Sequence, residues 1–337
     1  MALGLRELGK SGVRVTELGF GGAPIGAIGG RVTDADAHKI LRQAYDAGIR
    51  YFDTAPLYGH GLSEKRVGGF LQTVDRDSFA LSTKIGRLLV PADEGTRYAG
   101  MRDEEPFSIQ YDYSYDAVRR SFDASLSRLG LSRIDVLLCH DIDVWTHGDA
   151  QPEVFATARN GALKALSDMR EEGVIRAFGL GVNEAAVCSE VLDLFKVDCF
   201  LLAGRFTLLE QDPLDHLIPK CIENETSLII GGPYNSGLLA VRERRRATYD
   251  YKPVDDTRWQ KAEAIKAVCD VHGVDPRAAA LQYPLRHPVT AAVIPGVISA
   301  SELETNLELV AAPIPDALWN DLDKQGLARK IDAKTRG

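Results

Sequence analysis

The sequence predicts an α/β fold of the (β/α)8 barrel type, with an N-terminal β-hairpin and long loops at the C-terminal face. Short apolar or β-branched runs alternate with stretches of helical periodicity along the chain. This alternation requires crossover connections, which join parallel strands. The length of 337 residues exceeds the roughly 250 residues of a simple barrel. We therefore expect residues 1–337 to form a single barrel domain.

The elements follow in order from the N-terminus. The segments LRELG and VRVTELG flank the turn Lys10-Ser11-Gly12, which indicates a β-hairpin that closes one end of the barrel. Eight strand candidates follow, at residues 18–21, 50–53, 79–84, 134–140, 175–181, 198–202, 227–230 and 291–295. Helical periodicity is present in residues 34–48, 114–130, 161–173 and 301–310. Several of these helices end in glycine, the residue that best tolerates the conformation at a helix C-terminus.

Two connections, residues 86–113 and 231–256, are too long to be simple turns. Both follow predicted strands, so both are expected on the C-terminal face, where barrel enzymes carry their active sites. The alternative fold is a doubly wound open sheet, which normally carries a Gly-x-Gly-x-x-Gly motif for a dinucleotide. In GFGGAPIG, Pro24 stands where the third glycine should be, which favours the barrel.

Net charge and composition indicate which kinds of partner the protein can bind. The formal net charge of -8 opposes binding to a phosphate backbone, so we expect a small-molecule substrate and no nucleic acid. Apolar runs long enough for a membrane helix and a signal-peptide pattern are both missing from the sequence. The five cysteines are scattered and odd in number, which is typical of a reducing compartment. We therefore expect a cytoplasmic protein with no membrane partner, and the oligomeric state cannot be predicted.

Four polar side chains are expected to converge on one rim of the barrel. Asp53, Lys84 and His140 end consecutive predicted strands, and Tyr58 lies in the loop that follows Asp53. A phenol has an ordinary pKa near 10, so a tyrosine that carries a proton near neutral pH needs a neighbouring cation, which Lys84 can supply. A buried ammonium needs a counter-charge, which Asp53 can supply. His140 could orient a substrate oxygen or relay a proton.

Each of these residues also has a structural interpretation. A single Asp, Lys or His at a strand end is more often a cap or a member of a satisfied polar network, whereas ionisable groups gathered in one cleft favour a catalytic site. The segment from His140 to His147 has metal-binding residue types without a known ligand spacing, so we expect no metal. A Gly-x-Ser-x-Gly motif of serine hydrolases is missing from the sequence. The basic run 242–246 is interpreted as solvated surface.

Several motifs resemble those of the aldo-keto reductase family over nearly the whole chain. They are GFGGAPIG, FDTAPLYGHGLSEKRVG, STKIG, LLCHDID, and IPG followed by Asn306. The resemblance implies a nicotinamide cofactor bound in extended form, with Tyr58 as acid/base and with Asp53, Lys84 and His140 as its support. It also implies that the cofactor contacts Gly22, Ala23, Asp53, Asn183, Ser236, Gly237, Leu238, Gly296, Glu302 and Asn306.

The resemblance also bears on the choice of cofactor. Members of the family that prefer NADP grip its 2′-phosphate with a lysine and an arginine, at positions that match Gly296 and Glu302. The loss of both cations, with a carboxylate in place of one, predicts NAD. Gly231 replaces the aromatic residue on which the nicotinamide stacks in many relatives, and Ala203 replaces a glutamine. The cofactor is therefore expected to be held differently, with Asn183 at its carboxamide.

The segments GLGVNE, GRFTLLEQ and GGPYNSGLL resemble one branch of the family. That branch contains NAD-dependent aldose 1-dehydrogenases, of the L-fucose, D-threo-aldose and L-galactose types, and pyridoxal 4-dehydrogenase. Its substrates share a cyclic hemiacetal whose carbinol is oxidised to a lactone, with Tyr58 as base. More of the branch acts on sugars, so we expect an aldose, with pyridoxal, oxidised to 4-pyridoxolactone, as the alternative. A third possibility is a cofactor-binding, redox-sensing regulatory subunit.

The substrate pocket is expected to lie on the rim next to the tetrad. Its walls would be Tyr58, His140 and the aromatic side chains Trp145, Tyr111 and Tyr113. Aromatic rings suit the apolar face of a sugar and a pyridine ring equally well. These residues therefore do not discriminate between an aldose and pyridoxal.

Overall fold

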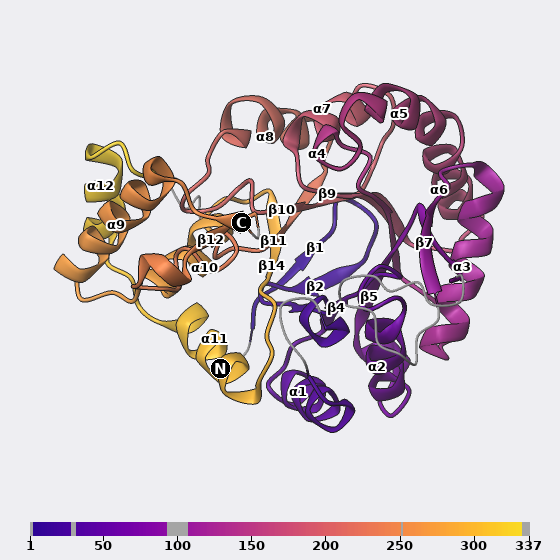
Figure 1. The fold of residues 1–337 in the computed structure, drawn as a ribbon, viewed down its shortest axis with the longest axis horizontal. Helices are drawn as coiled ribbons and strands as arrows, with labels where there is room; N and C mark the ends of the chain where they lie inside the picture. Colours follow the sequence, from indigo (N-terminus) through magenta and orange to yellow (C-terminus); the bar gives the residue numbers. More distant parts are fainter. Residues whose placement is uncertain (1–2, 28–31, 93–106, 251, 332–337) are drawn as a thin grey trace.

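Eight parallel strands form the barrel (Figure 1). The computed structural model describes residues 3–27, 32–92, 107–250 and 252–331. The strands are β3 (Phe20–Gly21), β4 (Tyr51–Asp53), β5 (Ala80–Ile85), β8 (Val136–His140), β9 (Ala177–Val182), β10 (Cys199–Ala203), β11 (Ser227–Gly231) and β14 (Thr290–Ile294). They pair in the order β14-β11-β10-β9-β8-β5-β4-β3, and parallel bridges from Leu18 to Val293 and from Gly21 to Gly296 close the ring. The predicted barrel and its eight strands are confirmed.

The barrel strands are buried on both faces, as expected when helices cover a closed parallel sheet. Strand β8 shows how the two faces divide. Leu137 and Cys139 pack in the cluster that joins strands to helices, whereas Val136 and Leu138 pack inside the barrel. This alternation follows from the two-residue period of a strand. Asp53 is the last residue of β4, and Lys84 is the last but one of β5.

The helices surround this sheet (Figure 1). One helix in each connection between barrel strands, and one after the last strand, are α1 (Asp34–Asp46), α2 (Leu62–Leu71), α3 (Tyr115–Leu129), α6 (Ala162–Glu171), α7 (Ala185–Leu192), α8 (Pro213–Glu223), α10 (Pro276–Leu285) and α11 (Ala300–Ala311). The additional helices are α4 (Val144–His147), α5 (Gln151–Asn160), α9 (Asp256–Val271) and α12 (Asp316–Lys324), and the 3-10 turns are η1 (Pro24–Gly26), η2 (Arg76–Ser78), η3 (Gly148–Ala150) and η4 (Arg244–Arg246). Helix α3 ends at Gly130 with φ 62°, as the glycine signal predicted.

An antiparallel hairpin closes the N-terminal end of the barrel. It consists of β1 (Leu5–Glu7) and β2 (Arg14–Thr16), with Leu5 opposite Thr16. Leu8, Val13 and Val15 are buried in one cluster with barrel-interior side chains. Burial of this apolar surface removes the interior from water at that end. The predicted hairpin and its position are confirmed.

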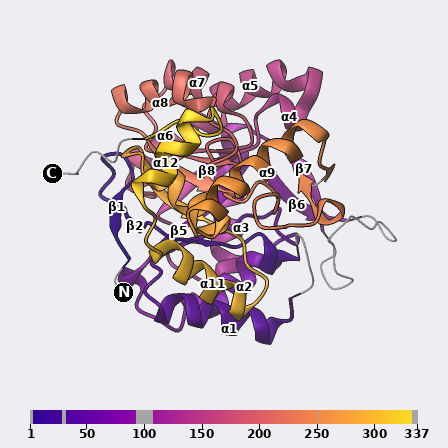
Figure 2. The ribbon, with the colours of Figure 1, turned by 90° about the vertical axis from the view of Figure 1, so that its left-hand side faces the viewer.

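The described parts of both long loops lie at the other end of the barrel (Figure 2). The first contains an antiparallel pair, β6 (Arg87–Pro91) and β7 (Phe107–Tyr111), and its residues 93–106 lie outside the described part. The second contains η4 and the short pair β12 (Thr248–Tyr249) and β13 (Lys252–Pro253). Among the described residues, no helix has the length and apolar character needed to cross a membrane.

Candidate active site

The structure brings the four predicted catalytic side chains together at the carboxyl ends of β4, β5 and β8. The Nζ of Lys84 donates to both carboxylate oxygens of Asp53, at 2.8 and 3.0 Å, and to the carbonyl of Thr54 at 2.9 Å. The same ammonium lies 4.8 Å from the ring centre of Tyr58. The ring of His140 lies edge-on to Tyr58, with 6.1 Å between ring centres. A charged donor, its counter-ion, a phenol and an imidazole therefore share one small site.

The pKa values in this cluster follow from burial and from its charges. Burial raises the pKa of Tyr58 to about 12, and the charge of Lys84 opposes this rise. Burial alone would lower the pKa of Lys84, but Asp53 and Tyr58 outweigh it and the pKa is raised. Burial, Arg87 and Lys84 together hold the pKa of His140 well below its usual value. At neutral pH the phenol is thus protonated, the lysine charged and the histidine neutral.

Two residues that the sequence analysis missed support Asp53 from inside the barrel. The hydroxyl of Ser82 donates to Asp53 Oδ1 at 2.6 Å, and the hydroxyl of Tyr51 lies 2.8 Å from the Ser82 oxygen. All three side chains are at most 2% exposed. Ser82 and Tyr51 each precede a tetrad residue by two positions, so the period of a strand turns them to the same face. That period was the signal that could have found them.

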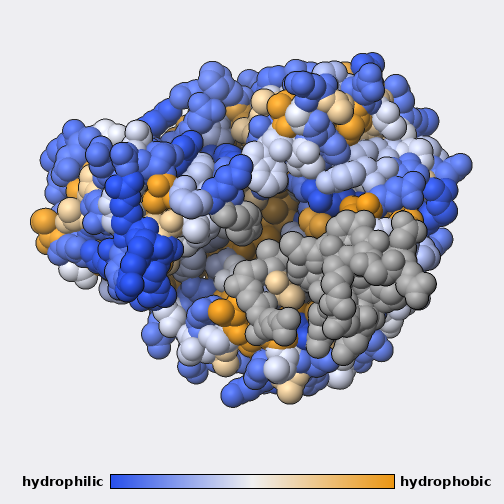
Figure 3. All heavy atoms as spheres, in the orientation of Figure 1, coloured by the Kyte–Doolittle hydropathy of each residue, from blue (hydrophilic) through white to orange (hydrophobic). Residues whose placement is uncertain are grey.

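A groove with a volume of about 680 Å³ opens beside the tetrad, and Asp53 and Tyr58 form part of its wall. Figure 3 shows a hollow near the centre of the molecular face, with hydrophobic residues on its floor. The predicted cofactor residues that line the groove are Gly22, Ala23, Asp53, Ser236, Gly237, Gly296, Glu302 and Asn306. Two predicted residues lie elsewhere. Leu238 is fully buried in the core, and Asn183 donates its side-chain amide to Asp141 at 3.0 Å.

The groove is lined by small residues that leave its floor open. A Cβ at Gly22 would lie 2.5 Å from the carbonyl oxygen of Asp53, and one at Gly296 would lie 2.6 Å from Pro24, so neither position has room for a side chain. Gly231 and Ala203 pair across β10 and β11 on the floor. An extended dinucleotide needs this kind of long surface that its phosphates can approach closely. The residues present therefore fit a nicotinamide dinucleotide.

Charged and polar side chains gather where α11 meets the groove. The carboxylate of Glu302 accepts a hydrogen bond from the backbone of Ile298 at 2.9 Å, which holds it back against the loop before α11. Tyr234 donates to Asn306 Oδ1 at 2.6 Å. Arg277 is the one Lys or Arg side chain among the described residues that line the groove, and it is paired with Asp275 at 2.6 Å. Neither Arg277 nor Tyr234 was predicted from the sequence. Arg277 lies outside the motifs, and Tyr234 lies within GGPYNSGLL, from which Ser236, Gly237 and Leu238 were chosen.

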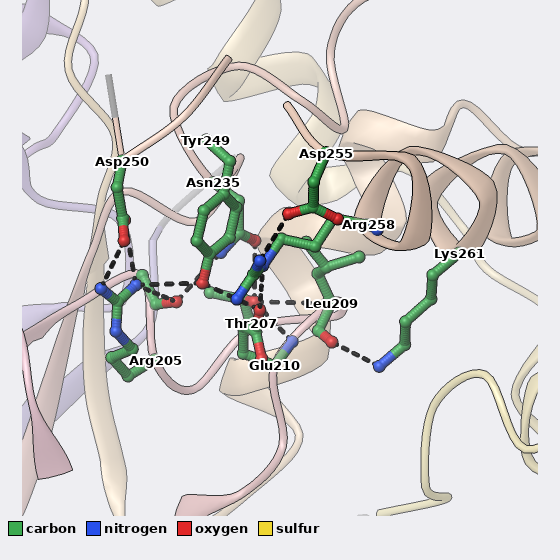
Figure 4. A network of polar contacts seen from close by, with 11 residues as sticks. Arg205, Thr207, Leu209, Glu210, Asn235, Tyr249, Asp250, Asp255, Arg258 and Lys261 are labelled. Atoms are coloured by element: carbon green, nitrogen blue, oxygen red, sulfur yellow. Dashed lines mark hydrogen bonds and ion pairs between the residues drawn. The ribbon is translucent and has the colours of Figure 1, made fainter. Parts of the chain in front are cut away.

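A polar network anchors the second long loop, which carries Ser236 and Gly237 (Figure 4). Arg205, after β10, pairs with Asp250 at 2.8 Å. Tyr249 donates to Glu210 at 2.9 Å, and the guanidinium of Arg258 lies 4.3 Å from its ring centre. In the same loop, Thr248 donates to the carbonyl of Ser236 at 2.7 Å. The loop therefore reaches the groove in a fixed position.

The aromatic residues expected around the substrate divide into two groups. Trp145 and Tyr111 are 48% and 46% exposed, and neither is among the residues that line the groove. Tyr113 is 3% exposed and donates to the backbone carbonyls of His140 and Asp141. Its hydroxyl thus supports the His140 segment and does not form a pocket wall. In the described part of the chain, no group of three or more His, Cys, Asp or Glu side chains is placed to hold a metal ion.

Comparison with known proteins assigns the family. Residues 17–326 match the Aldo/keto reductase family, and the chain belongs to that family. It is 38% identical to D-threo-aldose 1-dehydrogenase of a Pseudomonas species, over 93% of this chain and 94% of that protein. It is 37% identical to pyridoxal 4-dehydrogenase of Microbacterium luteolum, over 96% and 97% of the two chains. The protein is thus an oxidoreductase of the aldo-keto reductase type, which acts on alcohol or aldehyde groups with a nicotinamide cofactor.

Two further similarities agree with this assignment. L-galactose dehydrogenase of Arabidopsis thaliana is 31% identical, over 91% of this chain and 88% of that protein. Among solved structures, the holo form of aldo-keto reductase AKR11C1 from Bacillus halodurans superposes with a TM-score of 0.73 and is 25% identical, over 99% and 98% of the two chains. The family and the barrel predicted from the sequence are both confirmed.

Proposed function

We propose that the protein oxidises the hemiacetal carbinol of an aldose to a lactone and passes the hydride to NAD. The observation that carries this proposal is the buried pair of Asp53 and Lys84 beneath Tyr58, beside a groove that reaches the tetrad. The relative named D-threo-aldose 1-dehydrogenase, which is 38% identical, supports an aldose as substrate.

Each tetrad residue has a distinct task in this reaction. Tyr58 takes the hydroxyl proton from the carbinol, and its high pKa means that the phenolate needs the charge of Lys84 beside it. Asp53 keeps Lys84 charged and in place. His140, neutral because of its lowered pKa, forms a hydrogen bond that orients the substrate oxygen. The bound nicotinamide supplies the hydride acceptor, and the protein supplies orientation and proton transfer.

The preference for NAD follows from the charges around α11. Glu302, Asn306 and the glycines along the groove would hold the cofactor. A carboxylate such as Glu302 can accept a hydrogen bond from a ribose 2′-hydroxyl, whereas it repels a 2′-phosphate. Arg277 could attract that phosphate, but its guanidinium already forms an ion pair with Asp275. The two carboxylates outnumber the one guanidinium, which favours NAD.

Pyridoxal is the second candidate substrate. The relative named pyridoxal 4-dehydrogenase is 37% identical over 96% of this chain. Pyridoxal also forms a cyclic hemiacetal, and the exposed rings of Trp145 and Tyr111 suit a pyridine ring as well as a sugar face. A redox-sensing regulatory role ranks third, because the assembled tetrad serves catalysis and would be superfluous in a sensor.

Steady-state kinetics with NAD test the proposal. L-fucose, D-arabinose, L-galactose and pyridoxal are compared by formation of the reduced nicotinamide, in the wild type and in Tyr58→Phe. We expect the highest kcat/KM for an aldose, and a fall in kcat of about 10²- to 10⁴-fold in Tyr58→Phe. A higher kcat/KM for pyridoxal would reverse the substrate ranking. Full activity in Tyr58→Phe would refute the mechanism, and a lower KM for NADP than for NAD would refute the cofactor preference.

A further inference from the structure

The segment His140-Asp141-Ile142-Asp143 contains a buried carboxylate to which the proposed reaction assigns no task. Asp141 directly follows His140, is 5% exposed and has a positive φ of 46°. Non-glycine residues seldom adopt this backbone conformation, and when they do, the surrounding contacts must hold them there. The contacts of Asp141 therefore show which groups hold its backbone in this conformation.

The side chain of Asp141 connects three elements of the rim. Its Oδ1 accepts a hydrogen bond from the Asn183 side chain, which follows β9, at 3.0 Å. Its Oδ2 is ion-paired with Arg87 of β6 and lies 3.4 Å from Nε2 of His140, at the end of β8. Arg87 and Asp141 are both less than a tenth exposed, so little water reaches this pair. Because water is largely excluded, the ion pair and the hydrogen bond from Asn183 hold the carboxylate of Asp141 in one position.

The backbone of Asp141 is also fixed. Its carbonyl accepts from the hydroxyl of Tyr113 at 2.9 Å and lies 2.8 Å from Nε2 of His147. The Nδ1 atom of His140, by contrast, is buried and has no hydrogen-bond partner in the described part of the chain. No bond on that nitrogen therefore orients the imidazole. The carboxylate of Asp141 lies 3.4 Å from its other nitrogen, Nε2.

We propose that Asp141 is a positioning residue that orients His140 and joins the β6–β7 pair and Asn183 to the active-site rim. This inference rests on the proposed function, because His140 is the residue that is positioned. Asp141 would act through His140 and would not touch the reacting atoms itself. Its loss should therefore affect substrate turnover much more than cofactor binding.

The charge of Asp141 makes this positioning sensitive to pH. The charged groups that face it are Arg87 from β6, Lys84 from β5, and Asp143 from its own segment. The neutral titratable groups around it are His140, Tyr58 and Tyr113. Burial raises the pKa of Asp141 to about 6, and Arg87 opposes the rise. As pH falls through this value, the carboxylate gains a proton and its pairing with Arg87 weakens. Turnover should then fall more steeply below this pH than the loss of the Tyr58 phenolate alone would cause, and this additional fall is the acid limb. His140, whose pKa is held well below its usual value, does not account for it.

Asp141→Asn, with Asp135→Asn as its matched control, tests the inference. Asp135 precedes β8 at the opposite end of the strand, is 1% exposed and pairs with Arg76 at 2.6 Å, so its replacement breaks a comparable buried pair far from the site. We expect Asp141→Asn to lower kcat by about tenfold or more and to abolish the acid limb. Asp135→Asn should keep the wild-type kcat and pH profile. In both variants NADH affinity, measured by fluorescence titration, should stay within about twofold of the wild type.

Arg87→Met provides an independent readout if Asp141→Asn does not fold. Loss of the guanidinium should raise the pKa of Asp141 further, so the acid limb should move to higher pH. A wild-type kcat and pH profile in Asp141→Asn, or an unmoved limb in Arg87→Met, would overturn the inference. Tyr58→Phe separates this failure from failure of the proposed function, because only the latter leaves that variant active.

Discussion

The two ends of the groove are built in different ways. At the reaction end, Asp53 and Lys84 are 2% and 1% exposed, and the carboxylate and the ammonium are hydrogen-bonded to each other. At the end near α11, Glu302 is exposed and its carboxylate accepts one backbone hydrogen bond. A buried charge that loses its partner is costly, whereas an exposed charge can be exchanged at little cost to stability. The reaction end is therefore constrained by folding as well as chemistry, and the other end can vary with the cofactor.

The largest effect is expected from Lys84→Met, at the reaction end. The variant removes the cation that opposes the raised pKa of Tyr58, so a smaller fraction of Tyr58 is present as phenolate. We therefore expect kcat to fall by about 10³-fold. It also leaves Asp53 buried without its counter-charge, which should lower the free energy of unfolding by about 3 kcal/mol. Steady-state kinetics and urea denaturation measure the two effects.

The double variant Asp53→Asn with Lys84→Met separates stability from catalysis. Removal of both charges should recover much of the stability lost in Lys84→Met, because no unpaired buried charge remains. Activity should stay low, since the cation beside Tyr58 is still missing. A double variant as active as the wild type would show that the pair serves folding alone.

At the other end, Glu302→Lys should change the cofactor and leave the fold intact. A lysine would replace a repulsive charge with an attractive one for the 2′-phosphate, so the ratio of NADP to NAD affinity should rise about ten- to hundredfold. Glu304→Lys on the same helix is the matched control, because Glu304 is exposed and does not line the groove. Fluorescence titrations with NADPH and NADH measure both. An equal change in the two variants would mean that general charge, and not the position of Glu302, decides the preference.

The pH dependence should distinguish the two ends again. In the oxidation the protonated phenol of Tyr58, with a pKa of about 12, must first lose its proton. The phenolate fraction therefore increases with pH, and kcat should rise by up to about tenfold per pH unit above neutrality wherever proton transfer limits the rate. NAD affinity should change little over that range. A flat alkaline profile in the wild type would contradict Tyr58 as the base.

The sequence predicted the reaction end more completely than the other. Asp53, Lys84 and His140 could be brought together because parallel strands of a barrel end at one rim. Asn183 could not be placed, because its partner Asp141 depends on a left-handed backbone that the sequence does not signal. Arg277 comes from a helix that no motif connects to the groove. Strand ends are thus predictable from topology, whereas loop conformations and helix faces depend on packing.

The smallest effect is expected from Ser82→Ala, inside the barrel at the reaction end. Its hydroxyl donates to Asp53 at 2.6 Å, so its loss leaves more of the carboxylate charge to act on Lys84 and Tyr58. The pKa of Tyr58 should rise slightly and kcat should fall about threefold. Thr83→Val is the control, because Thr83 is equally buried but donates to Glu64 on the outer side of the strand. Both variants should lose about 1–2 kcal/mol in urea denaturation, since each leaves a buried carboxylate with one donor fewer. Equal kcat values in the two variants would show that Ser82 contributes to the fold alone.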